Sequence, residues 1–441
     1  MSFFFGMEKS GAGLFLCKAK TWHIMKKQEI MRKIREEQSM SVLDNFLKYV
    51  SYDTQSDAAS DTAPSTAKQL VLAEELAKEL RELGLANAKV DPYGIVYATL
   101  DATAQNAPAI GLISHMDTAA EMPGKDVHPR VIENWDGSVI ELGDGHSMSP
   151  DEFPQLKGVI GDTIVVTDGT TLLGADDKAG IAIIMQTLRD LIEKNLPHGR
   201  IEVAFTPDEE IGRGVENFDL NKFKVDYCYT LDGGEAEEVD YETFNAASAD
   251  LTFTGLSIHP GSAKDKMINA IQAAADYACM LPSWMIPAHT SGREGFIHLL
   301  GMSGECEAAK SSYIIRDHDL DKLEEKKELM RKAADLLNAA YGTHVVDIEF
   351  HDQYRNMAAY MAGHEDSVQK AYRAIEKAGL TPQSSPVRGG TDGAVLSAEG
   401  LFTPNLGTGG GNCHGRYEFA SVDKMNLMEQ IVLNLITEGL N

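Results

Sequence analysis

Residues 200–212 read RIEVAFTPDEEIG: an apolar stretch runs directly into three consecutive carboxylates, Asp208, Glu209 and Glu210. The apolar residues of RIEVAF alternate with the others, which is typical of a β-strand. Acids this close raise one another's pKa and repel, so the triplet adds nothing to stability by itself. An isolated triplet is most simply a solvated loop. Whether it carries chemistry depends on what the rest of the chain brings to the same place.

Strands and helices alternate on both sides of this stretch. Three short apolar runs predict further strands at 94–100, 109–114 and 227–231. Amphipathic patterns predict helices at 41–50, 65–84 and 176–194. This alternation predicts an α/β fold in which helices cover a mixed, mainly parallel sheet.

The pattern changes near residue 247. Strands and helices from there to residue 355, including a long charged helix at 322–342, predict a compact α+β unit of about 110 residues, a size that stands alone as a domain. The α/β pattern returns afterwards. We therefore expect a catalytic domain formed by residues 40–246 and 356–441, with the smaller domain 247–355 inserted into it.

The first 39 residues differ from the rest in charge, with eight Lys or Arg against four Glu. Their short apolar run precedes the basic cluster, which is the reverse of the order in a secretory signal. A helix-forming segment opens at Ser41. We expect residues 1–39 to be either non-native upstream sequence, with Met40 as the true start, or a flexible N-terminal arm.

The overall composition excludes several classes of protein. A net charge of −27 argues against nucleic acid and anionic membrane as partners, because both bind basic surfaces. No apolar run approaches the ~20 residues of a membrane-spanning helix. The five cysteines form no C-x-x-C pair, which indicates reduced thiols and a cytoplasmic location.

Metal-binding residue types follow several predicted strands. His115 and Asp117 come after the strand at 109–114, and Asp232 comes directly after the strand at 227–231. Asp176 and Asp177 lie in a glycine-flanked loop that enters a helix. Ligand sites of open α/β sheets lie outside the carboxyl ends of the strands, so we expect these side chains to meet. Carboxylates with imidazoles and no thiolate predict a site for Zn²⁺ or a similar divalent ion.

Eight short motifs follow in an order typical of one enzyme family: HMD (115–117), GADDK (174–178), TPDEEIG (206–212), DGG (232–234), HPGSAK (259–264), IIRD (314–317), RGGTDGA (388–394) and CHG (413–415). From about Met40 to the C-terminus the chain resembles the dinuclear zinc peptidases, which include relatives of carboxypeptidase G and succinyl-diaminopimelate desuccinylase. Within that family it is most similar to the tripeptide aminopeptidases of the peptidase T group.

The resemblance implies two Zn²⁺ ions per subunit, with Co²⁺ or Mn²⁺ as alternatives. His115 and Asp232 would hold one ion, and Glu210 and His414 the other. Asp176, the acid two residues before a lysine, would bridge them. The family often has a cis peptide bond after this bridging acid.

The resemblance also implies the catalytic groups. Asp117 would orient His115, and Glu209 would be the general base that deprotonates a shared water and later protonates the leaving amine. Asp208 receives no catalytic role, and we expect it to support the loop or cap the chain locally.

Four residues are implied to contact the substrate or the oxyanion. His259 would cross a dimer interface to the partner's active site, and Asn269 and Arg316 match substrate-binding positions of the smaller domain, which would act as a lid and a dimerisation domain. Arg388 would line the cleft. From the residues alone, His259 is better read as a turn residue, and Arg316 could equally form a surface ion pair with Asp317 or Asp319.

The function implied is release of the N-terminal residue from tripeptides by a homodimer whose only other partner is a small peptide. A dipeptidase or an N-acyl amino acid deacylase would use the same metal ligands and stays an alternative. A non-catalytic metal-dependent binding protein is a third reading, although it would normally lack the base that Glu209 supplies.

Overall fold

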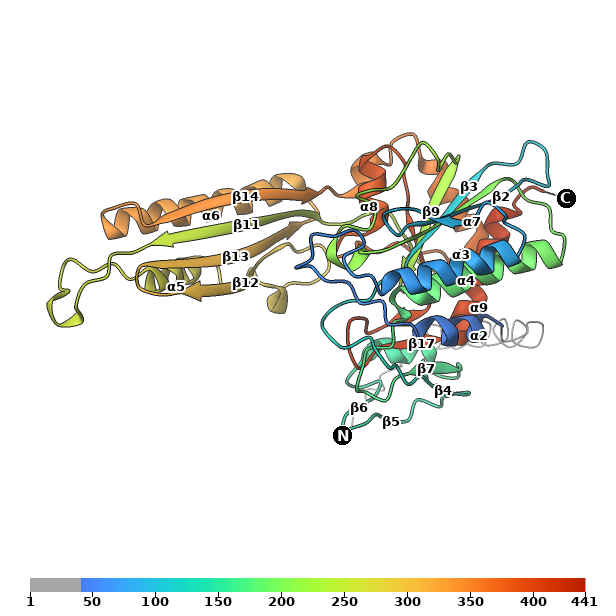
Figure 1. Ribbon diagram of the computed structural model, residues 1–441, viewed down its shortest axis with the longest axis horizontal. Coiled ribbons are helices and arrows are strands. Elements are labelled where there is room, and N and C mark those ends of the chain that lie inside the picture. The colour runs from blue at the N-terminus through green and yellow to red at the C-terminus, as the bar shows by residue number, and fades with distance from the viewer. Residues whose placement is uncertain (1–40, 441) are drawn as a thin grey trace, which may run out of the picture.

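The computed structural model describes residues 41–440. A large sheet and its helices form one part of the molecule, and a second sheet with two helices extends from it to the left in Figure 1. The predicted extension 1–39 and the predicted start at Met40 lie outside the described residues.

The large sheet has seven strands in the order β1-β2-β8-β3-β9-β15-β10. Their bounds are Lys89–Val90 (β1), Val96–Leu100 (β2), Ile110–His115 (β3), Ile201–Thr206 (β8), Tyr227–Gly233 (β9), Val239–Asp240 (β10) and Asn405–Gly407 (β15). The central strands β8, β3, β9 and β15 run parallel, and the outer strands pair antiparallel with their neighbours. The sheet is therefore mixed, as predicted, with the parallel strands at its centre.

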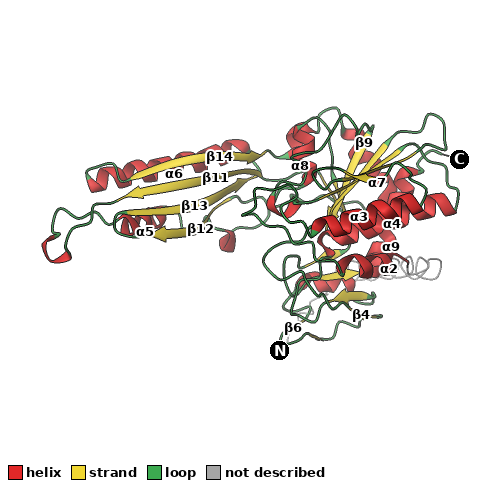
Figure 2. Cartoon of the chain, viewed as in Figure 1, coloured by secondary structure: helices red, strands yellow, loops and turns green. Residues whose placement is uncertain are grey.

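Helices cover one face of this sheet (Figure 2). These helices are α2 (Ser41–Val50), α3 (Gln69–Glu82), α4 (Ala175–Glu193), α7 (Glu365–Lys377) and α9 (Val422–Ile436). The period-two pattern of β8 explains the arrangement, since Ile201, Val203 and Phe205 pack in the core under the helices. Ala204 points to the other face, which is covered by the chain around Phe218 and by α8 (Asp392–Ala398).

The second sheet is antiparallel, in the order β12-β13-β11-β14. Its elements are β11 (Asn245–Thr254), α5 (Ala270–Met280), β12 (Phe296–Gly304), β13 (Ala308–Asp317), α6 (Leu320–Tyr341) and β14 (Val346–Tyr354). Alternate residues of β11, from Ala247 to Phe253, are buried with residues of α5 and α6, so one face of the sheet is covered. This inserted α+β unit is called the lid below, and 247–355 remain its proposed limits.

Short elements complete the fold. They are β4 (Arg130–Ile132), β5 (Ile140–Glu141), β6 (Ser147–Met148), η1 (Pro154–Val159), β7 (Ile164–Val166), η2 (Glu209–Ile211), η3 (Pro260–Ser262), η4 (Pro287–His289), η5 (Met357–Tyr360), β16 (Gly410–Gly411) and β17 (Phe419–Ser421). A small sheet in the order β16-β17-β7-β4 lies next to α4 and α9. Among the described residues, no helix has the length and apolar character needed to cross a membrane.

Candidate metal centre

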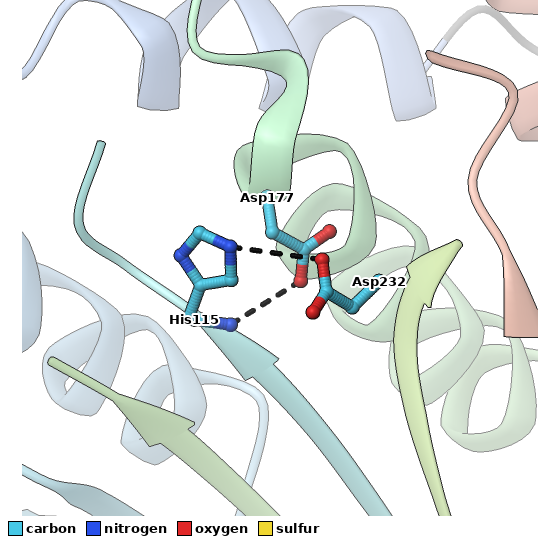
Figure 3. Close-up of side chains that lie close together, drawn as sticks. All are labelled: His115, Asp177 and Asp232. Atoms are coloured by element: carbon cyan, nitrogen blue, oxygen red, sulfur yellow. Dashed lines mark hydrogen bonds and ion pairs between the residues drawn. The ribbon is translucent and has the colours of Figure 1, made fainter. Parts of the chain in front are cut away.

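The metal-binding residue types gather at the carboxyl edge of the large sheet. His115 ends β3, the acidic triplet follows β8, and Asp232 lies near the end of β9. Asp176 and Asp177 open α4, which packs against β3 and β9. Figure 3 shows the side chains of His115, Asp177 and Asp232 pointing toward one another from these three elements.

Asp176 lies between two histidines. Its Oδ1 is 2.9 Å from Nε2 of His115, and its Oδ2 is 3.4 Å from Nε2 of His414. On the His115 side, Nε2 is also 3.6 Å from Oδ1 of Asp232. On the His414 side, Nε2 is 3.0 Å from Oε2 of Glu210. The five side chains implied as ligands therefore form two groups that share Asp176.

Asp177 is the other acid that reaches this cluster, and with His115 and Asp232 its oxygen lies within a 4.8 Å group of potential ligand atoms. Its Oδ2 accepts hydrogen bonds from the Ser114 hydroxyl and, at 3.2 Å, from the backbone N–H of His115. Its Oδ1 accepts from the N–H of Gly180 at 3.3 Å. These bonds make Asp177 a support of the loop, whereas Asp176 faces both histidines. The peptide bond between the two acids is cis.

The charges of this cluster suit cations. Burial opposes a charge on His115, yet its hydrogen bonds to three carboxylates raise its pKa well above the usual value. The carboxylates of Asp176 and Glu210 raise the pKa of His414 to about 11. The Oε1 atom of Glu210 is buried and has no hydrogen-bond partner within residues 41–440. The negative charge of the acids thus stabilises positive charge at His115 and His414, and Glu210 has a carboxylate oxygen available for a further ligand. This set of donor atoms fits divalent ions.

Asp117 contacts three other residues of the site. This fully buried carboxylate accepts the backbone N–H of Glu209 at 2.9 Å through Oδ1 and that of Glu210 at 3.2 Å through Oδ2. Its Oδ1 is also 3.4 Å from Nδ1 of His115, the ring nitrogen that faces away from Asp176. Asp117 thereby orients a candidate ligand and holds the acidic triplet against the cluster.

Glu209 adjoins the cluster without an ion pair of its own among the described residues. Burial raises its pKa well above the usual range, and the charge of His115 opposes this rise. A carboxylate with raised proton affinity has the property that a general base needs.

Asp208 points away from the candidate ligands. It adopts a left-handed backbone with φ of 60° and is 2% exposed. Its carboxylate accepts hydrogen bonds from the Ser65 N–H at 2.6 Å, from the Ser65 hydroxyl, and from Nε2 of Gln69 at 2.6 Å. The first acid of the triplet therefore anchors the loop to the start of α3, the supporting role expected for it.

Two buried acids of the site were not assigned from the sequence. Glu418 accepts the N–H groups of Leu173, Gly174 and Asp176 at 2.7, 2.8 and 3.1 Å and so holds the loop of the bridging acid. Asp392, within the RGGTDGA motif, accepts the Thr206 hydroxyl at 2.7 Å. Burial raises the pKa of each carboxyl to about 7. The only sequence signal for Glu418 is its position four residues after His414.

The structure does not bring His259 and Asn269 to the metal centre of their own chain. Nδ1 of His259 accepts the N–H of Gly261 at 3.1 Å, and Asn269 caps α5 by accepting the N–H of Gln272 at 3.3 Å. Both belong to the loop region that follows β11, which lies at the far left end of the molecule in Figure 1, away from β9.

Arg316 and Arg388 lie where the lid meets the large sheet. Arg316 donates to the carbonyls of Ala247 and Ile315, both at 3.0 Å, and its guanidinium is 5.6 Å from the ring centre of Tyr354. Burial raises the pKa of Tyr354, and the charge of Arg316 opposes this rise.

The guanidinium of Arg388 forms its hydrogen bonds with the lid. It donates to the carbonyls of Gly292 and Glu294 at 2.8 and 2.7 Å, and to the Thr290 hydroxyl at 2.9 Å. Its guanidinium also lies 5.2 Å from the ring centre of Phe244. These contacts attach the 388–394 loop to the lid and leave this side chain little capacity to bind a substrate.

An α/β sheet with an inserted lid, and two groups of acids and histidines sharing one aspartate at its carboxyl edge, define a metal-dependent hydrolase. Comparison with known proteins agrees. The sequence profile described as "Peptidase family M20/M25/M40" matches residues 168–438. Peptidase T of Clostridium novyi is 48% identical over 400 residues, which cover 90% of this chain and 98% of that protein.

Solved structures match the fold. The aminopeptidase PepT of Bacillus cereus superposes with a TM-score of 0.70 at 26% identity, over 90% of this chain and 97% of that one. A tripeptidase of Staphylococcus aureus also superposes with a TM-score of 0.70, at 21% identity over the same shares. The chain belongs to peptidase family M20/M25/M40 and is a metallo-aminopeptidase.

Proposed function

We propose that this enzyme releases the N-terminal residue from tripeptides and uses two divalent ions, expected to be Zn²⁺. The observation that carries the proposal is Asp176, whose two oxygens face His115 on one side and His414 on the other. His115 with Asp232, and His414 with Glu210, would complete the two sites. The names of the 48% identical relative and of the two solved neighbours support the peptide substrate.

The proposed reaction assigns one proton-transfer group. When bound, the ions supply Lewis acidity that polarises the scissile carbonyl and acidifies a water molecule. The Glu209 carboxylate accepts the proton of the attacking water and then donates it to the leaving amine. Asp117 holds the backbone of Glu209, so the carboxylate stays beside the reacting atoms while its charge changes. Burial of Glu209 favours its protonated form and so assists the first transfer.

We further propose that the enzyme is a homodimer in which His259 completes the partner's site as an oxyanion donor. The ten-residue strand β11 leads away from the large sheet, a distance of about 30 Å at ~3.3 Å per residue. A side chain beyond its end is remote from its own Asp232, which supports a role in a second subunit. Asn269 would act from the same end, and Arg316 would bind the substrate carboxylate from within the chain.

A substrate comparison tests the proposed activity. The protein is treated with a chelator, reloaded with Zn²⁺, Co²⁺ or Mn²⁺, and assayed on Leu-Gly-Gly, on Leu-Gly and on N-acetylated Leu-Gly-Gly. We expect metal-dependent release of leucine from the free tripeptide alone. Equal cleavage of the blocked peptide would favour a deacylase, and preference for Leu-Gly would favour a dipeptidase.

The cellular location is also a proposal. The four cysteines within residues 41–440 are all free thiols, which supports a reducing compartment and hence the cytoplasm.

A further inference from the structure

A cavity of about 670 Å³ opens beside the metal centre. Asp176 and Asp232, both candidate ligands, form part of its wall, so the cavity is continuous with the reacting position. A space of this size suits a small peptide, because sites for small molecules commonly measure about 300–1,000 Å³. Its wall also contains residues outside the metal centre.

That wall carries two aromatic side chains, Phe153 and Tyr417. Their ring centres are 4.7 Å apart and their planes are inclined by 35°. Both residues are half-buried. Each packs on the core of the small sheet and also lines the cavity. They form one apolar surface next to the metal centre.

Hydrogen bonds between side chains and the backbone hold this aromatic pair in place. The Asn412 N–H donates to Oε1 of Gln155 at 3.3 Å, and Nδ2 of Asn412 donates to the Tyr417 carbonyl at 3.1 Å. These bonds tie the loop that follows β16 to the segment that carries Phe153. The pair is thus built from two chain segments that the same loop positions, the loop that also contains His414.

The charges of the cavity indicate which end of a peptide it accepts. Four aspartates line it, namely Asp176, Asp177, Asp232 and Asp240, and within residues 41–440 no Lys, Arg or His is among its lining residues. Bound ions would neutralise Asp176 and Asp232, but a wall whose lining holds no cationic side chain offers a terminal carboxylate no partner, so a terminal ammonium suits it better. Arg316, the cation proposed to bind the substrate carboxylate, is not among the lining residues.

We propose that Phe153 and Tyr417 form the subsite for the side chain of the substrate's N-terminal residue and give the enzyme a preference for large apolar residues there. This inference rests on the proposed aminopeptidase activity. A leucine or methionine side chain at this position would lie against both rings, whereas an alanine methyl would reach little of them. The aromatic pair therefore sets selectivity at the first position and leaves the third position unaffected.

The test uses the metal-loaded enzyme with Phe153→Ala, and with Tyr417→Ala as an independent second variant. The measured quantity is the ratio of kcat/KM for Leu-Gly-Gly to that for Ala-Gly-Gly, which we expect to fall about tenfold in each variant, as for loss of a few apolar contacts. Tyr93→Ala, at a tyrosine that is 45% exposed and outside the cavity lining, is the control and should keep the ratio. Melting temperatures identify any variant that misfolds.

The outcomes separate the two proposals. An unchanged Leu-to-Ala ratio in a folded, active Phe153→Ala enzyme would overturn the subsite and leave the tripeptide activity intact. A fall in the ratio for Ala-Gly-Leu to Ala-Gly-Gly instead would also overturn it, because the cavity would then hold the C-terminal residue. Absence of all tripeptide turnover in the metal-loaded wild-type enzyme would refute the proposed function, and the subsite with it.

Discussion

Replacing a carboxylate by an amide should have different effects at Asp208 and Glu209, the first two acids of the TPDEEIG loop. Asp208→Asn removes a charge from a buried carboxylate that accepts three hydrogen bonds from Ser65 and Gln69. Glu209→Gln changes a side chain that forms no ion pair within residues 41–440, while its backbone N–H stays bonded to Asp117. We therefore expect the first change to reduce stability and the second to abolish activity.

The magnitude for Asp208→Asn follows from its contacts. An amide keeps one acceptor oxygen and presents an NH₂ group to the donors on the other side, so one or two charge-assisted bonds are lost. At about 1.5–3 kcal/mol for each bond, the loss is ~3 kcal/mol. Unfolding of about 400 residues carries an entropy of roughly 0.8 kcal/mol/K, so the melting temperature should fall by about 4 °C.

Differential scanning calorimetry of the two variants, each with its metal content measured, checks this expectation. Glu209→Gln should melt within about 1 °C of the wild-type enzyme, retain its metal, and lose a factor of about 10²–10⁴ in kcat. The reasoning would be refuted if Asp208→Asn lost its bound metal without loss of stability, because Asp208 would then be a ligand. Retained turnover in Glu209→Gln would remove the general base from the mechanism.

Three further changes test other parts of the structure. Glu418→Gln weakens the acceptor that holds the Asp176 loop, so metal affinity should fall about 10–100-fold in a chelator competition, and unchanged affinity would contradict that positioning role. A lysine at position 388 cannot keep all three lid contacts, so amide hydrogen exchange of residues 290–294 should be faster in Arg388→Lys than in the wild-type enzyme. Equal exchange rates in the two proteins would show that these contacts do not hold the lid. Ion pairs with Arg373 and Lys370 lower the pKa of Glu438 to about 2. The contribution of Glu438 to the free energy of unfolding is therefore present above pH ~4.5 and is lost as the pH falls toward 2. Glu438→Gln should lower the free energy of unfolding by about 1 kcal/mol at pH 7 and make urea unfolding less dependent on pH between 5 and 2. Equal pH dependence in the variant and the wild-type enzyme would rule out these ion pairs as a source of acid sensitivity.

Local sequence patterns predicted most of the fold correctly. The alternation in RIEVAF became β8, with Ile201 and Phe205 under the helices, because a period of two places such residues on one face of a strand. The ends of the strands were also predictable, so the convergence of His115, Asp232 and the acidic triplet followed from topology.

Roles that depend on long-range contacts were not predictable in the same way. Ser65 anchors Asp208 from 143 residues away, and Glu418 binds the N–H of Asp176 across 242 residues. No local pattern encodes such pairs, because they form only when separate loops pack against one another. Arg388 likewise donates to the lid carbonyls of Gly292 and Glu294, 96 and 94 residues away.

The sequence by itself determined which residue types stand at the strand ends, and therefore the class of chemistry and the family. Only the tertiary structure decided what each of three adjacent acids does. Asp208 turns to α3, while the N–H groups of Glu209 and Glu210 are bound by Asp117, which holds these two acids at the cluster. The tertiary structure also brought together Phe153 and Tyr417, which are 264 positions apart in the sequence. The physical reason is the range of the interactions: strand periodicity acts between near neighbours, whereas the site is completed by contacts between distant segments.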